Sequence, residues 1–215
     1  MTNKQVHSDH YFRGYDSIDR FISYFYQVDL VKSIDVVTAL EIGVGNRTVS
    51  NYLKEHGYTL TTCDIDPDLK PDYVADIRSL PFDDNSFDAV LAYEVLEHLP
   101  WTEVPTALKE LHRVSKKYVL ISVPYSCLAF ELTVYFPFIK RLLNKPFIDL
   151  IFLRLPYFFR KMEFDGEHYW EMGKKGFSIY AVRDILRKDF TIHKEIRPTL
   201  KPIHYFFILQ KSCNT

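Results

Sequence analysis

Two glycines stand directly after an apolar run and an acidic residue, in the segment Glu41-Ile-Gly43-Val-Gly45. Glycine lets the backbone adopt positive φ angles and approach a ligand without a Cβ atom in the way. The order of apolar run, glycines and helix-compatible residues predicts a strand, a tight turn and a helix. A carboxylate beside this turn would repel a pyrophosphate, so Glu41 favours a ligand that carries positive charge. Taken alone, the glycine pair is equally consistent with a purely structural turn.

A second acidic residue, Asp64, ends the next predicted strand and follows Gly45 by 19 positions. One crossover helix separates the two strands, so their carboxyl ends face one crevice of a doubly wound fold. A carboxylate at this point accepts hydrogen bonds from both vicinal hydroxyls of a ribose. The alternative is that Asp64 only caps the turn that follows it.

Alternating strands and helices are the elements that would position these residues. Their alternation across residues 36–124 indicates right-handed βαβ units and a mainly parallel sheet. Two strands near the end of the chain are close enough in sequence to pair antiparallel. The further elements that the spacing predicts are an amphipathic helix over 15–34, strands over 87–92 and 118–123, helices from about 102 and over 178–186, and final strands over 191–196 and 203–210.

With these residues in place, the chain resembles the class I S-adenosylmethionine-dependent methyltransferases, in particular the large group that acts on small molecules. The glycine loop matches the first motif of that family, and Asp64 matches its ribose-binding acid. The other matching segments are Asp76-Ile77 with Leu80-Pro81-Phe82, and Ser86 to Val90 with Glu94 to Leu99. The resemblance is strongest over 36–124, extends from 165 to the end, and is absent from about 126 to 163.

The resemblance implies an α/β fold with a doubly wound, mainly parallel seven-stranded sheet, its last strand antiparallel, and S-adenosyl-L-methionine as cofactor, with S-adenosyl-L-homocysteine as product. The glycine loop would hold the methionine moiety, Asp64 the ribose and Asp76 the adenine amino group, with Tyr93 as the floor. The implied cofactor-binding residues are Glu41, Gly43, Val44, Gly45, Asp64, Ile65, Asp76, Ile77 and Tyr93.

Two residues of the glycine loop depart from the expected motifs. Arg47 occupies the third glycine position of the family's loop, and its guanidinium would contact solvent, substrate or a neighbouring helix. Thr48 stands where a nicotinamide-binding Gly-x-Gly-x-x-Gly fingerprint needs its last glycine. Together with Glu41, Thr48 argues against a nicotinamide oxidoreductase.

A sulfonium already activates the methyl group, so positioning and exclusion of water can carry much of the catalysis. If the acceptor is a hydroxyl, a general base becomes useful, and the candidates are His98, Glu94 and His168. For His98, packing of its loop against the sheet is an equal alternative, and Glu97 is expected to face solvent or cap a helix. No pair of potential ligands has the sequence spacing of a metal site, so no metal is expected.

An insertion follows the fifth strand, over about 126–163, and carries aromatic side chains interleaved with basic ones. Between Ser126 and Met162 it holds six basic and two acidic residues, a local charge of +4 in a chain of net charge −1. Its prolines predict several short helices, and hence a helical lid near the acceptor pocket. Such a surface suits a membrane interface or an amphiphilic substrate. Packing on the domain or on a second subunit is equally consistent.

The length of 215 residues favours one methyltransferase domain over 1–215, with the helix 15–34 and the lid as its additions. Three separated cysteines indicate neither disulfides nor zinc and fit the cytoplasm. Neither a secretory signal nor a spanning segment is expected.

The sequence therefore predicts a cytoplasmic enzyme, in peripheral contact with a membrane or free of it, that methylates a small-molecule or lipid- or glycan-linked acceptor. Nucleic acid is not expected as a partner, because the chain lacks a broad basic groove outside the insertion. A homodimer or a membrane contact through 126–163 is the predicted use of the insertion. The alternative is a non-catalytic cofactor-binding module that serves as a partner subunit through its aromatic insertion.

Overall fold

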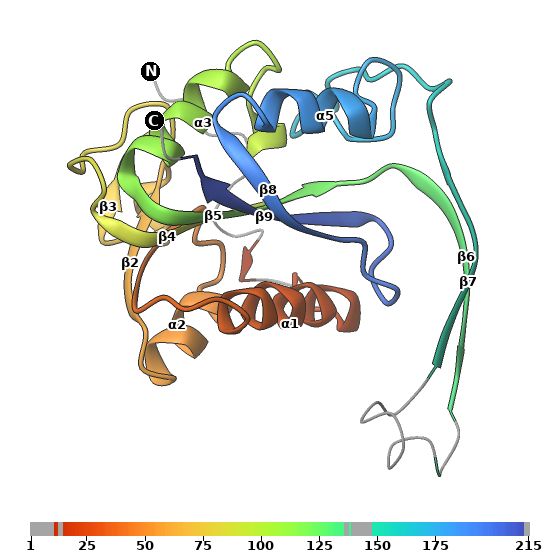
Figure 1. Ribbon diagram of the computed structural model, residues 1–215, viewed down its shortest axis with the longest axis horizontal. Coiled ribbons are helices and arrows are strands. Elements are labelled where there is room, and N and C mark those ends of the chain that lie inside the picture. The colour runs from red at the N-terminus through yellow and green to blue at the C-terminus, as the bar shows by residue number, and fades with distance from the viewer. Residues whose placement is uncertain (1–10, 13–14, 136–137, 139–147, 213–215) are drawn as a thin grey trace.

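A seven-stranded sheet forms the centre of the computed structural model, which describes residues 11–12, 15–135, 138 and 148–212 (Figure 1). The strands lie in the order β3-β2-β1-β4-β5-β9-β8. Their bounds are β1 (Thr38–Ile42), β2 (Thr59–Asp64), β3 (Tyr73–Val74), β4 (Phe87–Tyr93), β5 (Ser115–Pro124), β8 (Phe190–Ile196) and β9 (His204–Lys211).

The first five of these strands pair in parallel, and β9 pairs antiparallel with both β5 and β8. The prediction of a mainly parallel α/β sheet with an antiparallel last strand is therefore confirmed. Parallel strands require crossover connections, which bring the carboxyl ends of β1, β2 and β4 to the same edge of the sheet.

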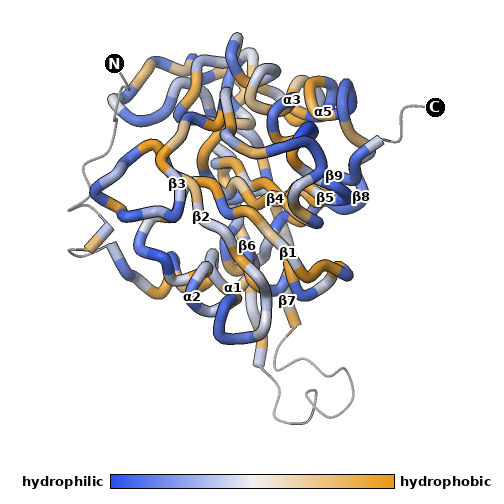
Figure 2. The backbone as a smooth tube through the Cα atoms, turned by 90° about the vertical axis from the view of Figure 1, so that its left-hand side faces the viewer, coloured by the Kyte–Doolittle hydropathy of each residue, from blue (hydrophilic) through white to orange (hydrophobic). Residues whose placement is uncertain are grey.

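Helices cover both faces of the sheet. On one face lie α1 (Ile18–Lys32) and α2 (Thr48–Glu55), and on the other lie α3 (Val104–Val114) and α5 (Ile179–Leu186) (Figure 1). Two buried apolar clusters separate the sheet from these layers. Along β9, Phe206 packs towards α1 and α2 while Phe207 packs towards α3 and α5, which is the two-residue period of a strand buried on both faces. Figure 2 shows apolar stretches concentrated along the central strands.

Local signals set the helix bounds and the loops that carry the site. The Ser17 hydroxyl accepts a hydrogen bond from the Arg20 backbone N–H at 3.2 Å and so begins α1 within the predicted range 15–34. Two short 3₁₀ helices follow strands of the sheet, namely η2 (Pro67–Leu69) after β2 and η3 (Leu96–His98) after β4.

Among the described residues, no helix combines the length and the apolar character needed to cross a membrane. The described cysteines, Cys63 and Cys127, are free and buried.

The insertion after β5 is an antiparallel hairpin, so the prediction of a helical insertion is wrong. Its strands are β6 (Cys127–Val134) and β7 (Ile148–Pro156), which form a sheet of their own (Figure 1). Of the three prolines, Pro156 ends β7, whereas Pro137 and Pro146 lie outside the described residues. The segment forms strands rather than helices because apolar side chains recur at every second residue of β6. This period gives one apolar face on a strand but not on a helix.

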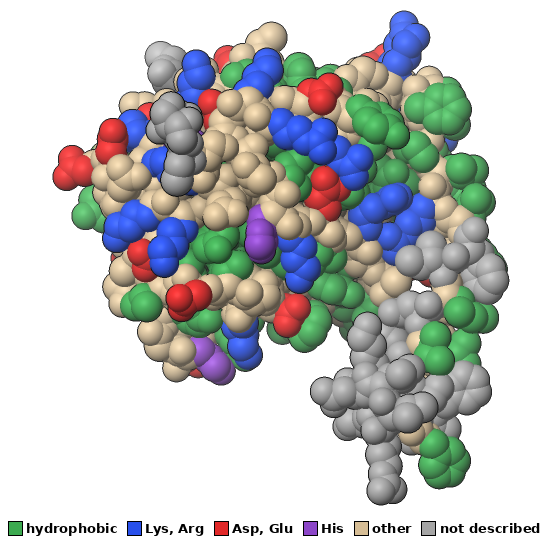
Figure 3. Space-filling view, in the orientation of Figure 1, with side chains coloured by type: hydrophobic (Ala, Val, Ile, Leu, Met, Phe, Trp, Pro, Cys, Tyr) green, Lys and Arg blue, Asp and Glu red, His purple; other side chains and the backbone are tan. Residues whose placement is uncertain are grey.

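One face of this hairpin carries an exposed apolar ladder. Three pairs of directly opposite residues form it: Leu128 with Leu155, Phe130 with Leu153, and Leu132 with Leu150. On the hairpin, Arg154 ties the two strands together, because its Nε donates to Glu131 Oε1 at 2.6 Å. Arg154 also donates to the backbone oxygens of residues 197 and 198, which joins the hairpin to the loop between β8 and β9. Figure 3 shows apolar side chains along the right edge of the molecule, where the hairpin lies.

Candidate active site

A cavity of about 1110 Å³ lies at the carboxyl ends of β1, β2, β4 and β5. Residues after these strands line it, together with Tyr11 and Tyr15 before α1 and a segment around residues 167–171. The structure brings together all twelve residues that the sequence suggested, because each of them lines this cavity. They are Glu41, Gly43, Val44, Gly45, Asp64, Ile65, Asp76, Ile77, Tyr93, Glu94, His98 and His168.

The glycine loop after β1 is held in a conformation that needs glycine. Gly43 has a φ of +80°, and a Cβ atom built there would lie 2.7 Å from Val95 Cγ2. The Gly43 N–H donates to the Cys63 carbonyl at 3.0 Å, which fastens the loop to the end of β2. The loop therefore passes close to the segment after β4 and presents its backbone to the cavity.

Asp64 joins the ends of β1 and β2. Its Oδ2 accepts the Val44 N–H at 2.8 Å and its Oδ1 accepts the Asp66 N–H at 2.9 Å. Burial raises the pKa of Asp64, although these backbone donors oppose the shift. The carboxylate is thus held in one orientation at the cavity wall.

Glu41 is a buried acceptor at the same wall. Its side chain is 5% exposed, and its Oε2 atom has no hydrogen-bond partner. Burial raises the pKa of Glu41 to about 8. A cationic ligand group in the cavity would both pair with this oxygen and favour the ionised carboxylate.

Asp76 and Ile77 form the wall on the side of β3. Asp76 accepts hydrogen bonds from the backbone N–H and the Nε of Arg78, both at 2.8 Å, and Arg78 also pairs with Glu103. These bonds from Arg78 lower the pKa of Asp76. The second oxygen, Oδ2, accepts from Arg78 Nη2 as well. The carboxylate predicted to meet an adenine is therefore already engaged by Arg78 through both oxygens, and Oδ2 keeps one lone pair for a further donor.

Tyr93, the last residue of β4, lines the wall of the cavity. Its ring is buried against Phe206, and its hydroxyl donates to the Gln27 carbonyl of α1 at 3.2 Å. Burial raises the pKa of Tyr93 well above its ordinary value. The hydroxyl is thus used by the fold, and the ring supplies the surface expected of a floor.

Arg47 adopts a φ of +65° at the start of α2, a backbone conformation that glycine would adopt without strain. Its guanidinium donates to the carbonyls of Leu69 and Lys70 at the end of η2. Of the three contacts left open by the sequence, the neighbouring helix is the one observed. Arg47 therefore ties the glycine loop to the loop after β2.

Glu94 marks the other end of the cavity, at the carboxyl end of β4. It has a φ of +54°, and its N–H donates to the Ser122 carbonyl at 3.1 Å. Its Oε2 lies 3.5 Å from His204 Nε2, while its Oε1 has no hydrogen-bond partner. Burial raises the pKa of Glu94 to about 7. The sequence assigned His204 only to a strand, so its place in the site comes from the fold of β9.

His98 and His168 lie next to each other, with ring centroids 5.1 Å apart. The Nδ1 atom of His98 lies 2.9 Å from the Glu167 carbonyl, and that of His168 lies 3.4 Å from Glu171 Oε1. Burial lowers the pKa of His98. Burial also acts to lower the pKa of His168, but Glu171 and Asp165 outweigh it and the net shift is upward.

Glu97 is fully buried, so the prediction that it faces solvent or caps a helix is wrong. Its exposure is 0%, and neither carboxylate oxygen has a hydrogen-bond partner. Burial raises the pKa of Glu97 well above its ordinary value. The η3 turn directs its side chain into the cavity, while the Tyr169 N–H donates to its backbone carbonyl at 2.8 Å. Its apolar neighbours, Leu96 and Leu99, were the sequence signal for this burial.

Tyr11 and Tyr15, two aromatic residues before α1, cover part of the cavity. The rings of Tyr11 and Tyr15 meet edge to face at 5.1 Å, and the Arg20 guanidinium lies 4.2 Å over Tyr15. Burial raises the pKa of both tyrosines. Their polar and aromatic surface adds to the water-excluding wall of the site.

Comparison with known proteins finds a matching family model and solved structures with a similar fold. Residues 40–122 match the family model of a methyltransferase domain. No curated protein matches the sequence. A 1,6-didemethyltoxoflavin-N1-methyltransferase from Burkholderia thailandensis, solved with 1,6-didemethyltoxoflavin and S-adenosylhomocysteine, superimposes with a TM-score of 0.60 at 14% identity, over 95% of this chain and 85% of the other.

Two further solved structures share the fold at similar identity. The N-methyltransferase NodS from Bradyrhizobium japonicum WM9, in complex with S-adenosylhomocysteine, has a TM-score of 0.56 at 14% identity, over 91% of this chain and 89% of its own. The magnesium protoporphyrin IX methyltransferase ChlM from Synechocystis PCC 6803, also with S-adenosylhomocysteine, has a TM-score of 0.57 at 13% identity, over 91% and 84%.

Proposed function

We propose that the chain binds S-adenosyl-L-methionine and methylates a small-molecule or lipid- or glycan-linked acceptor, because residues 40–122 match the family model of a methyltransferase domain. The whole of 1–215 acts as one domain in this proposal, with the hairpin as its insertion. The observation that carries the proposal is Glu41, whose Oε2 is buried, has no hydrogen-bond partner and lies beside the glycine loop in the cavity. The cofactor's ammonium is the group that such an oxygen would pair with.

The residues of the cavity fit the cofactor along its length. Glu41 and the backbone of Gly43, Val44 and Gly45 hold the methionine moiety, and Asp64 with Ile65 holds the ribose. Asp76 and Ile77 meet the adenine, with Tyr93 beneath. When bound, the cofactor supplies an electrophilic methyl group, which bonds to a lone pair of the acceptor while the cofactor's sulfur keeps the electrons of the broken bond.

The residues at the far end of the cavity handle the acceptor. Glu94, His98 and His168 come from two separate segments and meet at this end. They orient the acceptor group, and Glu94 takes its proton, while Tyr11 and Tyr15 exclude water. Close positioning in a dry site is the main demand of a displacement at an activated methyl group.

The exposed ladder of the hairpin supports an amphiphilic acceptor. Its members Leu128, Phe130, Leu153 and Leu155 are each at least 39% exposed. The hairpin begins directly after Pro124, Tyr125 and Ser126, which line the cavity. An apolar face next to the acceptor end would rest on a membrane interface that holds the acceptor.

Arg47, which occupies the third glycine position of the loop, does not support the alternative of a non-catalytic partner subunit. Its guanidinium is used within the fold and lies on the carbonyls after η2, where it stabilises the loop.

Calorimetric titration with S-adenosyl-L-homocysteine tests the proposal directly. We expect binding in the micromolar range that Glu41→Gln weakens about tenfold, since a charge-assisted bond to the ammonium is worth roughly 1.4 kcal/mol or more. Glu55→Gln, on the exposed end of α2, is the matched control and should bind like the wild type. Absence of binding by the wild type, or equal binding of NADH, would overturn the cofactor assignment.

A further inference from the structure

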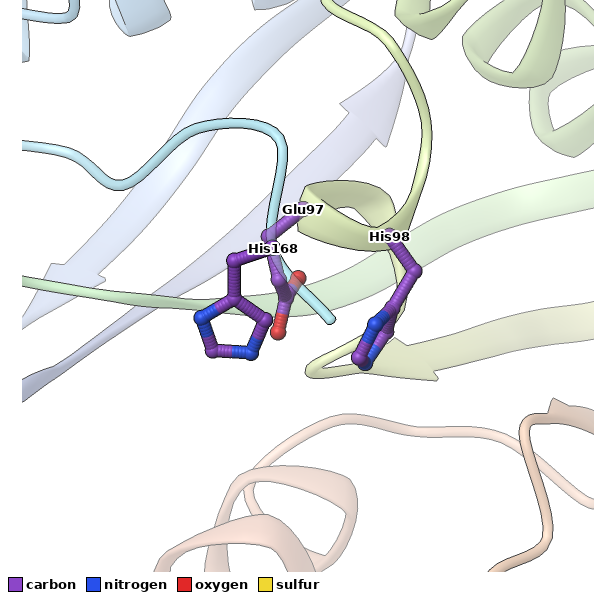
Figure 4. A group of neighbouring side chains, drawn as sticks. All are labelled: Glu97, His98 and His168. Carbon is purple, nitrogen blue, oxygen red and sulfur yellow. The ribbon is translucent and has the colours of Figure 1, made fainter. Parts of the chain in front are cut away.

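Three potential metal ligands converge at the acceptor end of the cavity. Glu97 and His98 come from η3, and His168 comes from the segment that follows the hairpin. One ligating atom of each lies within 4.8 Å of the other two. Figure 4 shows the Glu97 carboxylate between the two imidazole rings. Sequence spacing offered no metal site because His168 follows His98 by 70 positions.

The carboxylate of Glu97 is an acceptor that the protein itself does not satisfy. Its side chain is fully buried and aimed into the cavity, and both of its oxygens lack a hydrogen-bond partner. Burying an ionised carboxylate is costly unless a cation or several donors compensate it. A bound cation would satisfy both oxygens at once.

Both histidines are oriented as metal ligands usually are. The Nδ1 atom of His98 lies 2.9 Å from the carbonyl of Glu167, which can only accept, so Nδ1 carries the proton and Nε2 is the basic nitrogen. His168 Nδ1 faces Glu171 Oε1 at 3.4 Å in the same way. Histidines that bind metals typically donate their other N–H to a carbonyl or carboxylate, which fixes the ring.

A second group, Asp165, His168 and Glu171, shares His168 but fits a cation less well. Asp165 Oδ1 already accepts the N–H groups of Glu167 and His168, at 3.0 and 2.7 Å. Glu171 already pairs with Lys174 at 2.9 Å. These carboxylates are compensated within the protein, whereas that of Glu97 is not.

We propose that Glu97, His98 and His168 bind a divalent transition-metal ion, and that this ion in turn binds a hydroxyl of the acceptor. The proposal rests on the proposed methyltransferase function and narrows its acceptor to an oxygen nucleophile. Three protein ligands leave coordination positions open, as catalytic sites require. Two imidazoles with one carboxylate favour ions such as Fe²⁺ or Zn²⁺ over Mg²⁺ and Ca²⁺, which prefer oxygen ligands alone. Mn²⁺, which accepts both nitrogen and oxygen ligands, is the paramagnetic probe of the site.

The ion would act as a Lewis acid on the acceptor hydroxyl. Coordination weakens the O–H bond, and the proton passes to Glu94, whose Oε1 has no hydrogen-bond partner. The acceptor oxygen then bonds to the methyl carbon, and the carbon–sulfur bond breaks with its electron pair left on sulfur. The products are a methyl ether and the thioether form of the cofactor, so atoms and charge balance.

Titration of the chelator-treated protein with Mn²⁺ alone, followed by electron paramagnetic resonance of the free ion, tests the site without any acceptor. We expect one Mn²⁺ per chain, bound at least tenfold more weakly by Glu97→Gln and by His168→Ala. The matched controls are Glu55→Gln and His193→Ala, which replace exposed residues outside the cavity and should bind as the wild type does. Circular dichroism spectra and melting curves establish that each variant is folded.

Absence of saturable Mn²⁺ binding by the wild type, or equal binding by folded Glu97→Gln, would overturn the metal site. A parallel titration of the chelator-treated protein with S-adenosyl-L-homocysteine separates the two proposals. Cofactor binding without Mn²⁺ binding refutes the metal site alone. Mn²⁺ binding without cofactor binding refutes the proposed methyltransferase function and leaves the ligand set intact.

Discussion

The Val44 N–H donates to Asp64 Oδ2 at 2.8 Å, so the loop after β1 and the end of β2 are joined by one buried hydrogen bond. Asp64 Oδ1 is held in turn by the Asp66 N–H. The residue assigned to the ribose is thus also the residue that shapes the glycine loop. Its substitution therefore affects both binding and stability.

We expect Asp64→Ala to weaken S-adenosyl-L-homocysteine binding at least tenfold and to lower the free energy of unfolding by about 1–3 kcal/mol, because two buried N–H groups lose their acceptor. Calorimetry and urea unfolding measure the two effects. Asp184→Asn, on the exposed side of α5, is the control and should change neither. Unchanged cofactor affinity in a folded Asp64→Ala protein would refute the ribose role.

Gly43→Ala should destabilise the protein more than Gly57→Ala does. Both residues have positive φ angles, +80° and +90°, so both substitutions carry the backbone strain of about 1–2 kcal/mol. A Cβ atom at Gly43 would also lie 2.7 Å from Val95 Cγ2, whereas one at Gly57 meets nothing within 4 Å. Urea unfolding of both variants measures the difference. Equal destabilisation of the two variants would show that the loop has room for a side chain at residue 43. If the contact with Val95 is the cause, Val95→Ala should restore part of the stability lost in Gly43→Ala.

The pH dependence of stability should reveal Glu41. Burial raises its folded-state pKa from the ordinary 4.5 to about 8, so between these values the unfolded chain ionises while the folded one does not. The stability contribution is therefore complete below pH 4.5 and is lost as the pH rises towards 8, by an amount on the order of 5 kcal/mol.

Glu41→Gln removes this dependence. We expect the variant to gain stability relative to the wild type as the pH is raised from 5 to 8, measured by urea unfolding at each pH. Added S-adenosyl-L-homocysteine should reduce the pH dependence of the wild type, since its ammonium favours the ionised carboxylate. A stability difference that is constant with pH would contradict the shifted pKa.

The exposed ladder of the hairpin should mediate contact with a lipid surface. We expect Phe130→Ser with Leu153→Ser to abolish cosedimentation with vesicles of mixed neutral and anionic phospholipids, because the two side chains are 61% and 39% exposed and directly opposite each other. Binding of S-adenosyl-L-homocysteine should be unchanged.

Tyr180→Ser, which removes a 70% exposed ring from α5, is the control for this surface. Vesicle binding that survives the hairpin substitutions would refute the membrane contact. A dimer of the wild type in gel filtration that becomes a monomer in the variant would instead identify the ladder as an interface between two copies.

Some features of the site follow from local sequence. A strand that ends in glycines must turn there, and an acidic residue that ends the next parallel strand must face the same edge of the sheet. Gly43 and Asp64 could therefore be placed in one cavity from their spacing alone, whereas Tyr93 is placed there by the resemblance to the methyltransferase family. The antiparallel pairing of β8 and β9 follows in the same way from the short loop between them.

Other features depend on contacts that spacing does not contain. The alternation of Leu128 and Phe130 competes with the aromatic and proline content of the same segment, and pairing with β7 decides for a strand. Arg47 finds the carbonyls after η2 only because α2 brings the two loops together. Fully buried Glu97 shows the same dependence, since a carboxylate beside leucines is exposed or buried according to what covers it.

The sequence by itself determined the fold class, the parallel order of strand ends and the meeting of the glycine loop with Asp64 at one edge of the sheet, because these depend on short-range periodicity and on where each strand stops. Only the tertiary structure decided that the insertion is a hairpin, that Glu97 is buried without a hydrogen-bond partner, and that His168 lies beside His98. These depend on packing between segments far apart in the chain, and such contacts form only when the sheet and its connections are assembled.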